Sequence, residues 1–171
     1  LYGRIVGDVL FIITGGTIDS LAGGYRGNAI IPDGAKSYIP DYIASQKMPI
    51  ECDFQQVCMK DSSDITDEDR LEILQLIESS SLSKFIITHG TNTMPETLEY
   101  LSNNLQRKDV CVILTGSMIP LEGKFSDGGF NLGFTVSAIN SNKGIYIAMH
   151  GQLFEAGSVY KDFDALEFKV K

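Results

Sequence analysis

The chain has 171 residues, which is enough for one domain with a substantial core and short for two. Its 14 Lys and Arg residues and 22 Asp and Glu residues give a formal net charge of −8, which argues against binding to the phosphate backbone of nucleic acids. Hydrophobic residues make up 43% of the chain, which argues against disorder, yet the longest apolar runs are far too short to cross a membrane.

Apolar runs recur along the chain in the pattern of a buried sheet. Runs without alternation are typical of parallel strands buried on both faces, and they occur at 9–14, 85–88, 110–115 and 145–149. A fifth strand with partial alternation is expected at 50–59. Residues 20–40 contain several Gly and Pro residues and are expected to form a long functional loop.

Helical patterns lie between these strands. Thr66 is expected to cap the first helix, because acidic residues fill the turn that follows it. Thr93 and Glu96 have the spacing of a capping box at the start of a second helix, and a third helix is expected over about 127–140 with Phe130 on its apolar face. Alternating strands and helices predict a doubly wound α/β fold, with a mostly parallel sheet flanked by helices and a single domain over 1–171.

Cysteine and histidine are too sparse for a disulfide framework or a metal site. Cys52, Cys58 and Cys111 lie in strand-like segments and are expected to be small buried side chains in a reducing cytoplasm. No Cys-x-x-Cys or Cys/His cluster accompanies the two histidines, His89 and His150, so no metal is expected. The first residues lack the apolar core and cleavage site of a signal peptide, which agrees with a cytoplasmic location.

Glycine and hydroxyl residues follow three of the expected strands. These segments are Thr14-Gly-Gly-Thr-Ile18, Thr88-His-Gly-Thr-Asn-Thr93 and Thr115-Gly-Ser117. Ligands of open parallel sheets bind at the carboxyl ends of the strands, so Thr17 and Thr91 are expected to share one site. Backbone N–H groups beside the glycines would be available to hold an oxyanion or a carboxylate.

These segments also allow interpretations other than a catalytic site. A strand followed by Gly-Gly-Thr is, taken alone, most often a tight turn with a helix cap. No Gly-x-Gly-x-x-Gly follows the first strand, and neither a phosphate-binding P-loop nor a Gly-x-Ser-x-Gly motif is present. His89 follows a buried strand and is interpreted as a hydrogen-bonded structural residue rather than a base.

Four segments together resemble the bacterial-type L-asparaginase and glutaminase family. They occur in the family's order and with family-like spacing across nearly the whole chain: 14–18, Asp61-Ser-Ser-Asp64, Thr88-His-Gly-Thr-Asn-Thr-Met94 with Glu96-Thr97, and Leu114-Thr-Gly-Ser-Met118 with Ser126-Asp-Gly-Gly-Phe-Asn-Leu132. The resemblance implies the asparaginase N-terminal-domain fold and hydrolysis of a small amide, such as L-asparagine, to the acid and ammonia. It implies no metal and no other cofactor.

The resemblance also implies roles for individual residues. Thr17 would be the nucleophile that forms an acyl-enzyme, and Tyr25, in a loop beside Gly23-Gly24, would assist it. Thr91 would be the second catalytic threonine, supported by Lys161. The substrate would be held by six residues: Gly16, Ser62, Ser63, Gly90, Asn92 and Ser117.

Asn92 departs from the family pattern, in which an aspartate contacts the substrate ammonium group. Asparagine keeps an acceptor oxygen but loses the charge, so ammonium binding should weaken. Lys161 would lose an anionic partner, which should lower its pKa and let a neutral amine act as a base more easily. The preferred substrate is therefore expected to move away from a free α-amino acid.

The family's second, C-terminal domain has no counterpart in these residues. A single-domain relative with an altered substrate, or a weakened enzyme, is the expectation, and an exposed apolar surface would favour a homo-oligomer, with a dimer favoured. Two alternatives stay open: a weakened domain that binds a carboxylate or amide without turnover, and an ammonia-producing component of an amidotransferase. Neither a nucleic acid nor a membrane is expected as a partner.

Overall fold

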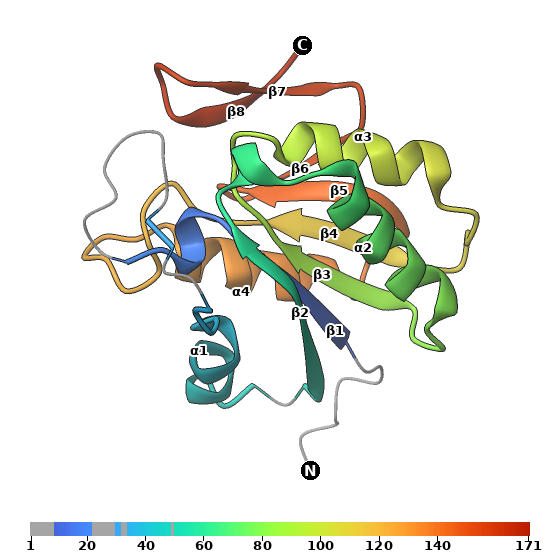
Figure 1. Cartoon of the computed structure of the whole chain (residues 1–171), viewed down its shortest axis with the longest axis horizontal. Helices are drawn as coiled ribbons and strands as arrows, with labels where there is room; N and C mark the ends of the chain where they lie inside the picture. The colour runs from blue at the N-terminus through green and yellow to red at the C-terminus, as the bar shows by residue number, and fades with distance from the viewer. Residues whose placement is uncertain (1–8, 22–29, 32–33, 49) are drawn as a thin grey trace.

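The computed structural model describes residues 9–21, 30–31, 34–48 and 50–171. Its centre is a six-stranded sheet with strand order β2-β1-β3-β4-β5-β6 (Figure 1). Strands β1 to β5 are parallel, and β6 is antiparallel to β5. Their bounds are β1 Val9–Gly15, β2 Cys52–Lys60, β3 Lys84–Thr88, β4 Cys111–Thr115, β5 Gly144–Met149 and β6 Gln152–Glu155. The predicted α/β fold with a mostly parallel sheet is confirmed.

Helices cover both faces of the sheet. Helices α2 (Asp67–Ser79) and α3 (Met94–Asn104) pack on one face, against side chains such as Ile12 and Val112. Helices α1 (Ile39–Ser45) and α4 (Gly128–Ala138) pack on the other, against side chains such as Phe11. Because the central strands are buried on both sides, their sequences are continuous apolar runs, as the sequence indicated.

Three helix expectations can be compared with the structure, and two need correction. Thr66 does form a capping box with Asp69, but the cap expected at Thr93 is wrong, because no side-chain hydrogen bond of Thr93 caps α3. The Thr93 hydroxyl instead donates to the backbone oxygen of Ser62 at 2.6 Å. Phe130 was expected on the apolar face of α4, yet it is 64% exposed, because the buried side of that helix is formed by residues such as Leu132.

A hairpin outside the main sheet follows β6. Strands β7 (Val159–Asp162) and β8 (Glu167–Val170) pair with each other in a two-stranded antiparallel sheet. Val159 and Phe168 are buried in the same hydrophobic cluster as α3, so they fix the hairpin on that helix. Neither this hairpin nor α1 and β6 were anticipated from the sequence. Two short 3-10 turns, η1 (Thr17–Asp19) and η2 (Ser62–Asp64), follow β1 and β2.

The length of the helices and the state of the cysteines follow from the described residues. None of the helices in this part of the chain is both long and apolar enough to span a bilayer. The three cysteines are free thiols, with Cys111 buried and Cys52 and Cys58 partly buried.

Candidate active site

Two glycines bring the carboxyl ends of β1 and β3 into backbone contact. A Cβ atom placed on Gly16 would lie 2.3 Å from both the Cα and the N atom of Gly90, so no side chain fits there. Gly16 also has a φ of 83°, in the left-handed region that glycine adopts at little cost. Thr17 and Thr91 are the next residues after these glycines, and the structure therefore brings these two segments together.

Ser62 lies against the same point from the end of β2. A Cβ atom on Gly90 would be 2.7 Å from the Ser62 hydroxyl oxygen, so the serine fills the space beside that glycine. The hydroxyl oxygen accepts hydrogen bonds from the backbone N–H groups of Asn92 at 3.2 Å and Thr93 at 3.4 Å. Ser62 is buried, whereas Ser63 is exposed on the same turn. The structure thus places Ser62, but not the Ser63 side chain, in the packed part of the site.

Lys161 reaches Thr91 from the hairpin. Its Nζ donates to Thr91 Oγ1 at 2.7 Å and to Asn92 Oδ1 at 2.6 Å. Burial lowers the pKa of Lys161, and the carboxylate of Asp61 opposes that shift. The ring of Phe163 lies 5.0 Å from Nζ, and a cavity of about 280 Å³ between α3 and the hairpin reaches both Lys161 and Asn92. A lysine with a lowered pKa, bonded to a threonine hydroxyl, is suited to take and return that hydroxyl's proton.

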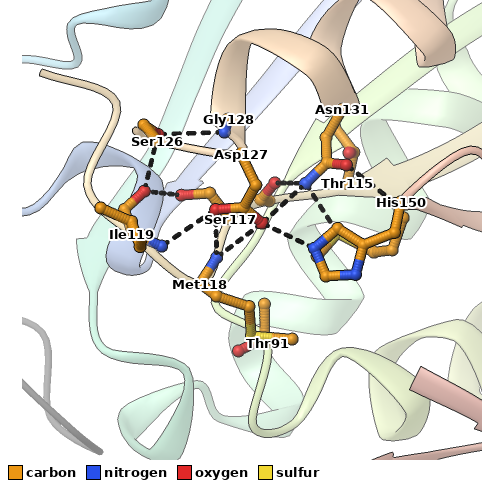
Figure 2. Close-up of polar contacts among 12 residues, drawn as sticks. Thr91, Thr115, Ser117, Met118, Ile119, Ser126, Asp127, Gly128, Asn131 and His150 are labelled. Carbon is orange, nitrogen blue, oxygen red and sulfur yellow. Dashed lines mark hydrogen bonds and ion pairs between the residues drawn. The ribbon is translucent and has the colours of Figure 1, made fainter. Parts of the chain in front are cut away.

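The end of β4 closes the site on its third side. A Cβ atom on Gly116 would lie 2.3 Å from the backbone oxygen of His89, and His89 N–H donates to the Thr115 oxygen at 2.9 Å. Ser117 is therefore held near the Gly90–Thr91 segment, and its hydroxyl donates to the Ile119 oxygen at 2.5 Å. Figure 2 shows Ser117, Met118 and Ile119 in the turn after β4, drawn together with Thr91.

His89 is a structural residue, as its position after a buried strand indicated. It is fully buried, and its Nδ1–H donates to the Gly90 oxygen at 2.7 Å. That bond fixes the tautomer, so Nε2 accepts from the Thr97 hydroxyl at 2.9 Å. Burial lowers the pKa of His89 to about 4, which keeps the ring neutral. The ring thereby orients the peptide group that precedes Thr91.

One part of the predicted site is not among the residues that the structure describes. Tyr25 and Gly23-Gly24 lie outside the described residues. No group of three or more His, Cys, Asp or Glu side chains suited to hold a metal occurs among residues 9–21, 30–31, 34–48 and 50–171. The residues that sequence reasoning missed are Asp127, Asn131 and His150, which bond to the turn after β4 or to one another. Asp127 and Asn131 could have been found from the sequence, because both lie in the 126–132 segment that is part of the family resemblance.

Comparison with known proteins agrees with this architecture. Residues 8–166 match the family model described as "Asparaginase, N-terminal". The chain belongs to the asparaginase family. It is 32% identical over 167 residues to the "Glutaminase-asparaginase" of Acinetobacter glutaminasificans, a match that covers 90% of this chain and 49% of that protein.

Two further relatives are similar over most of the chain. The "Probable L-asparaginase periplasmic" of Haemophilus influenzae is 28% identical over 165 residues, covering 90% of this chain and 46% of that protein. The solved structure of the "Probable Cytoplasmic L-asparaginase" of Campylobacter jejuni superposes with a TM-score of 0.78 at 26% identity, covering 96% of this chain and 53% of that one. This asparaginase-family chain spans about half the length of the curated relatives that it matches.

Proposed function

We propose that this chain is an asparaginase-type amidohydrolase domain, which releases ammonia from a small amide such as L-asparagine. The observation that carries the proposal is the bond from Lys161 Nζ to Thr91 Oγ1, beside the contact of Gly16 with Gly90. An amine and a hydroxyl at hydrogen-bond distance form a base and its proton donor. The glycine contact puts the Thr17 segment next to that pair.

The proposed reaction has two steps. In the first, Thr17 Oγ1 forms a bond to the amide carbon, the carbon–nitrogen bond breaks, and the nitrogen leaves as ammonia with the threonine's proton. In the second, water attacks the resulting ester, which restores the Thr17 hydroxyl and releases the acid. Lys161, in its neutral form, is the base that acts through Thr91, and Tyr25 assists Thr17. Neither step requires a metal or another cofactor.

Substrate contacts belong to the same proposal. We expect Gly16, Gly90 and Ser117 to contact the substrate through backbone atoms, and Ser62 to bind its carboxylate. The Ser62 hydroxyl oxygen already accepts two backbone N–H groups, which leaves its O–H hydrogen for donation to a carboxylate. Ser63 is exposed and would contact only a substrate that reaches solvent.

Ammonia release tests the proposal directly. Wild-type protein is incubated with L-asparagine, L-glutamine and amides that lack the α-amino group, with Thr17→Ala as the comparison. Ser141→Ala, at an exposed serine after α4, is the matched hydroxyl-removal control. Turnover that is abolished in Thr17→Ala and retained in Ser141→Ala supports a threonine hydrolase. Equal turnover in Thr17→Ala and wild type would refute it.

A ligand-binding domain without turnover is the second candidate, and Asn92 favours it. An asparagine at this position offers Lys161 a neutral oxygen at 2.6 Å and no anionic charge for a substrate ammonium group. Calorimetric binding of L-aspartate without any ammonia release from the amides would favour this candidate over the enzyme.

The proposal also includes a homodimeric assembly and a cytoplasmic location. The aromatic side chains Phe125, Phe130 and Phe163 are 84%, 64% and 62% exposed, which supports a homodimer that covers part of them. Sedimentation analysis tests that state. Three free thiols support a reducing compartment, the cytoplasm, and a periplasmic fraction containing the native protein would contradict it.

A further inference from the structure

Asp127 stands at the start of α4 but does not cap that helix. The hydroxyl of Ser126 accepts the Gly128 N–H at 3.0 Å, while the Asp127 carboxylate turns to the end of β4 (Figure 2). There it accepts the backbone N–H groups of Met118 and Ile119, each at 3.0 Å. One carboxylate therefore fixes two successive peptide groups of the turn that follows Ser117.

Two further side chains hold the Asp127 carboxylate in place. Asn131, one helical turn further along α4, donates from Nδ2 to Asp127 Oδ2 at 3.1 Å and to the Gly116 oxygen at 3.0 Å. His150, at the end of β5, approaches Oδ2 through Nε2 at 2.9 Å. The backbone N–H of His150 also donates to Asn131 Oδ1 at 2.8 Å, so the three residues form one closed network.

The turn of residues 116–121, which this network holds in place, contacts the Thr14–Ile18 segment and the Thr88–Thr93 segment. The Leu121 N–H donates to the Ile18 oxygen at 3.1 Å, directly after Thr17. At its other end the turn begins at Gly116, which is packed against the backbone of His89, two residues before Thr91. A shift of residues 116–121 would consequently move the surroundings of Thr17 and Thr91 together.

We propose that Asp127 is a positioning residue of the amide-hydrolysis site, which holds the 116–121 turn against the two threonine segments. This inference rests on the proposed function for its effect on catalysis. The carboxylate bonds to the backbone of the turn, to Asn131 and to His150, so we assign it no substrate contact. Its contribution is geometric, since small displacements of catalytic groups cost up to about 100-fold in rate.

Asparagine is the sharpest replacement, because it keeps the size of Asp127 and removes one acceptor oxygen. Its amide nitrogen would face the Ile119 N–H if it replaced Oδ1, or Asn131 Nδ2 if it replaced Oδ2, which leaves one of these donors without an acceptor. The matched control is Asp109→Asn. Asp109 precedes the opposite end of β4, where its carboxylate pairs with Arg107 at 2.6 Å on the surface.

The experiment measures kcat and KM for ammonia release together with hydrogen exchange of individual backbone amides. In Asp127→Asn we expect exchange at Met118 and Ile119 to accelerate by about tenfold or more, and kcat to fall by about 10- to 100-fold with a much smaller change in KM. Asp109→Asn should leave both within about twofold. His150→Gln, which removes a single partner, should lower kcat by about fivefold.

Two results would overturn the inference. One is a folded Asp127→Asn protein with wild-type kcat, and the other is a loss of kcat without faster exchange in the turn. If Asp127→Asn does not fold, His150→Gln decides in the same way. A wild-type protein that releases no ammonia from any amide refutes the proposed function instead, and the exchange rates alone then decide whether Asp127 holds the turn.

Discussion

Lys161 Nζ lies 2.7 Å from Thr91 Oγ1, although 70 residues separate the two in the chain. Thr91 follows a central strand of the sheet, whereas Lys161 belongs to a hairpin outside it. Val159 and Phe168 seat that hairpin on α3 by burying their apolar side chains. Hydrophobic packing therefore sets the position of the amine, and burial lowers its pKa.

The neutrality of Asn92 predicts the effect of a charge at that position. Asn92→Asp would place a carboxylate 2.6 Å from Lys161 Nζ and stabilise the ammonium form, which raises the lysine's pKa. Since the base must be neutral to act, the rising limb of the pH–rate profile should move upward by about one pH unit or more. The measurement is kcat/KM for amide hydrolysis against pH.

A second asparagine provides the control for this experiment. Asn103 is exposed near the far end of α3, so Asn103→Asp adds the same charge away from the lysine. Its pH profile should coincide with that of the wild type. An unshifted profile in Asn92→Asp would show that Lys161 is not the base that controls the rate.

The two serines of η2 should differ in their effect on stability. Ser62→Ala removes the acceptor of two backbone N–H groups in a buried place, and we expect it to lower the free energy of unfolding by about 1–3 kcal/mol. Ser63→Ala changes an exposed side chain and should stay within about 0.5 kcal/mol of the wild type. Urea unfolding of both variants makes the comparison, and equal stabilities would mean that the Ser62 bonds contribute nothing.

Sequence reasoning predicted the sheet and the meeting of its strand ends because both depend on local patterns. Continuous apolar runs specify buried parallel strands, and parallel strands bring their carboxyl ends to one edge. Thr17 and Thr91 could therefore be expected at one site. The glycines at positions 16 and 90 were interpreted as places where backbone N–H groups approach a ligand, whereas the structure shows these two residues in contact with each other.

Long-range side-chain contacts were not accessible in the same way. Thr93 and Glu96 have capping-box spacing, but the Thr93 hydroxyl bonds to Ser62, a residue 31 positions away, and a tertiary partner displaced the local one. Asp127 occupies a helix-start position, yet its carboxylate accepts a hydrogen bond from the turn after β4. Spacing along the chain carries no information about such partners, which only the folded backbone brings into reach.

The contact between Gly16 and Gly90 predicts a strong effect of a single methyl group. Gly16→Ala would force a Cβ to 2.3 Å from backbone atoms and keep a φ of 83° that alanine disfavours, so we expect a loss of more than about 3 kcal/mol of stability or a displaced Thr17 segment. Gly133→Ala is the control, because the residue is inside a helix and the new Cβ has no atom within 4 Å besides its chain neighbours and the nearby backbone of that helix. It should stabilise by about 0.5–1 kcal/mol, and urea unfolding of both variants measures the difference.

His89 links the stability of the site to pH. Its pKa falls from an ordinary value of 6.5 to about 4 in the folded protein, so the unfolded chain binds more protons between these two values. The stabilisation is complete above about pH 6.5 and is lost as the pH falls toward about 4, with a total of about 3 kcal/mol. Carboxylates titrate in the same range, so the comparison must be made with a variant that lacks the imidazole.

His89→Gln supplies that comparison. Because the carboxylates contribute equally to both proteins, the difference in unfolding free energy between wild type and His89→Gln isolates the ring. This difference should shrink by about 3 kcal/mol as the pH is lowered from about 7 to about 4, measured by urea unfolding at several pH values. A difference that stays constant across this range would mean that the folded ring takes up its proton at the same pH as the unfolded one. Below that pH the Thr97 hydroxyl would donate to no acceptor on the imidazole, and the geometry that fixes the Gly90 peptide beside Thr91 would have to differ from the one described.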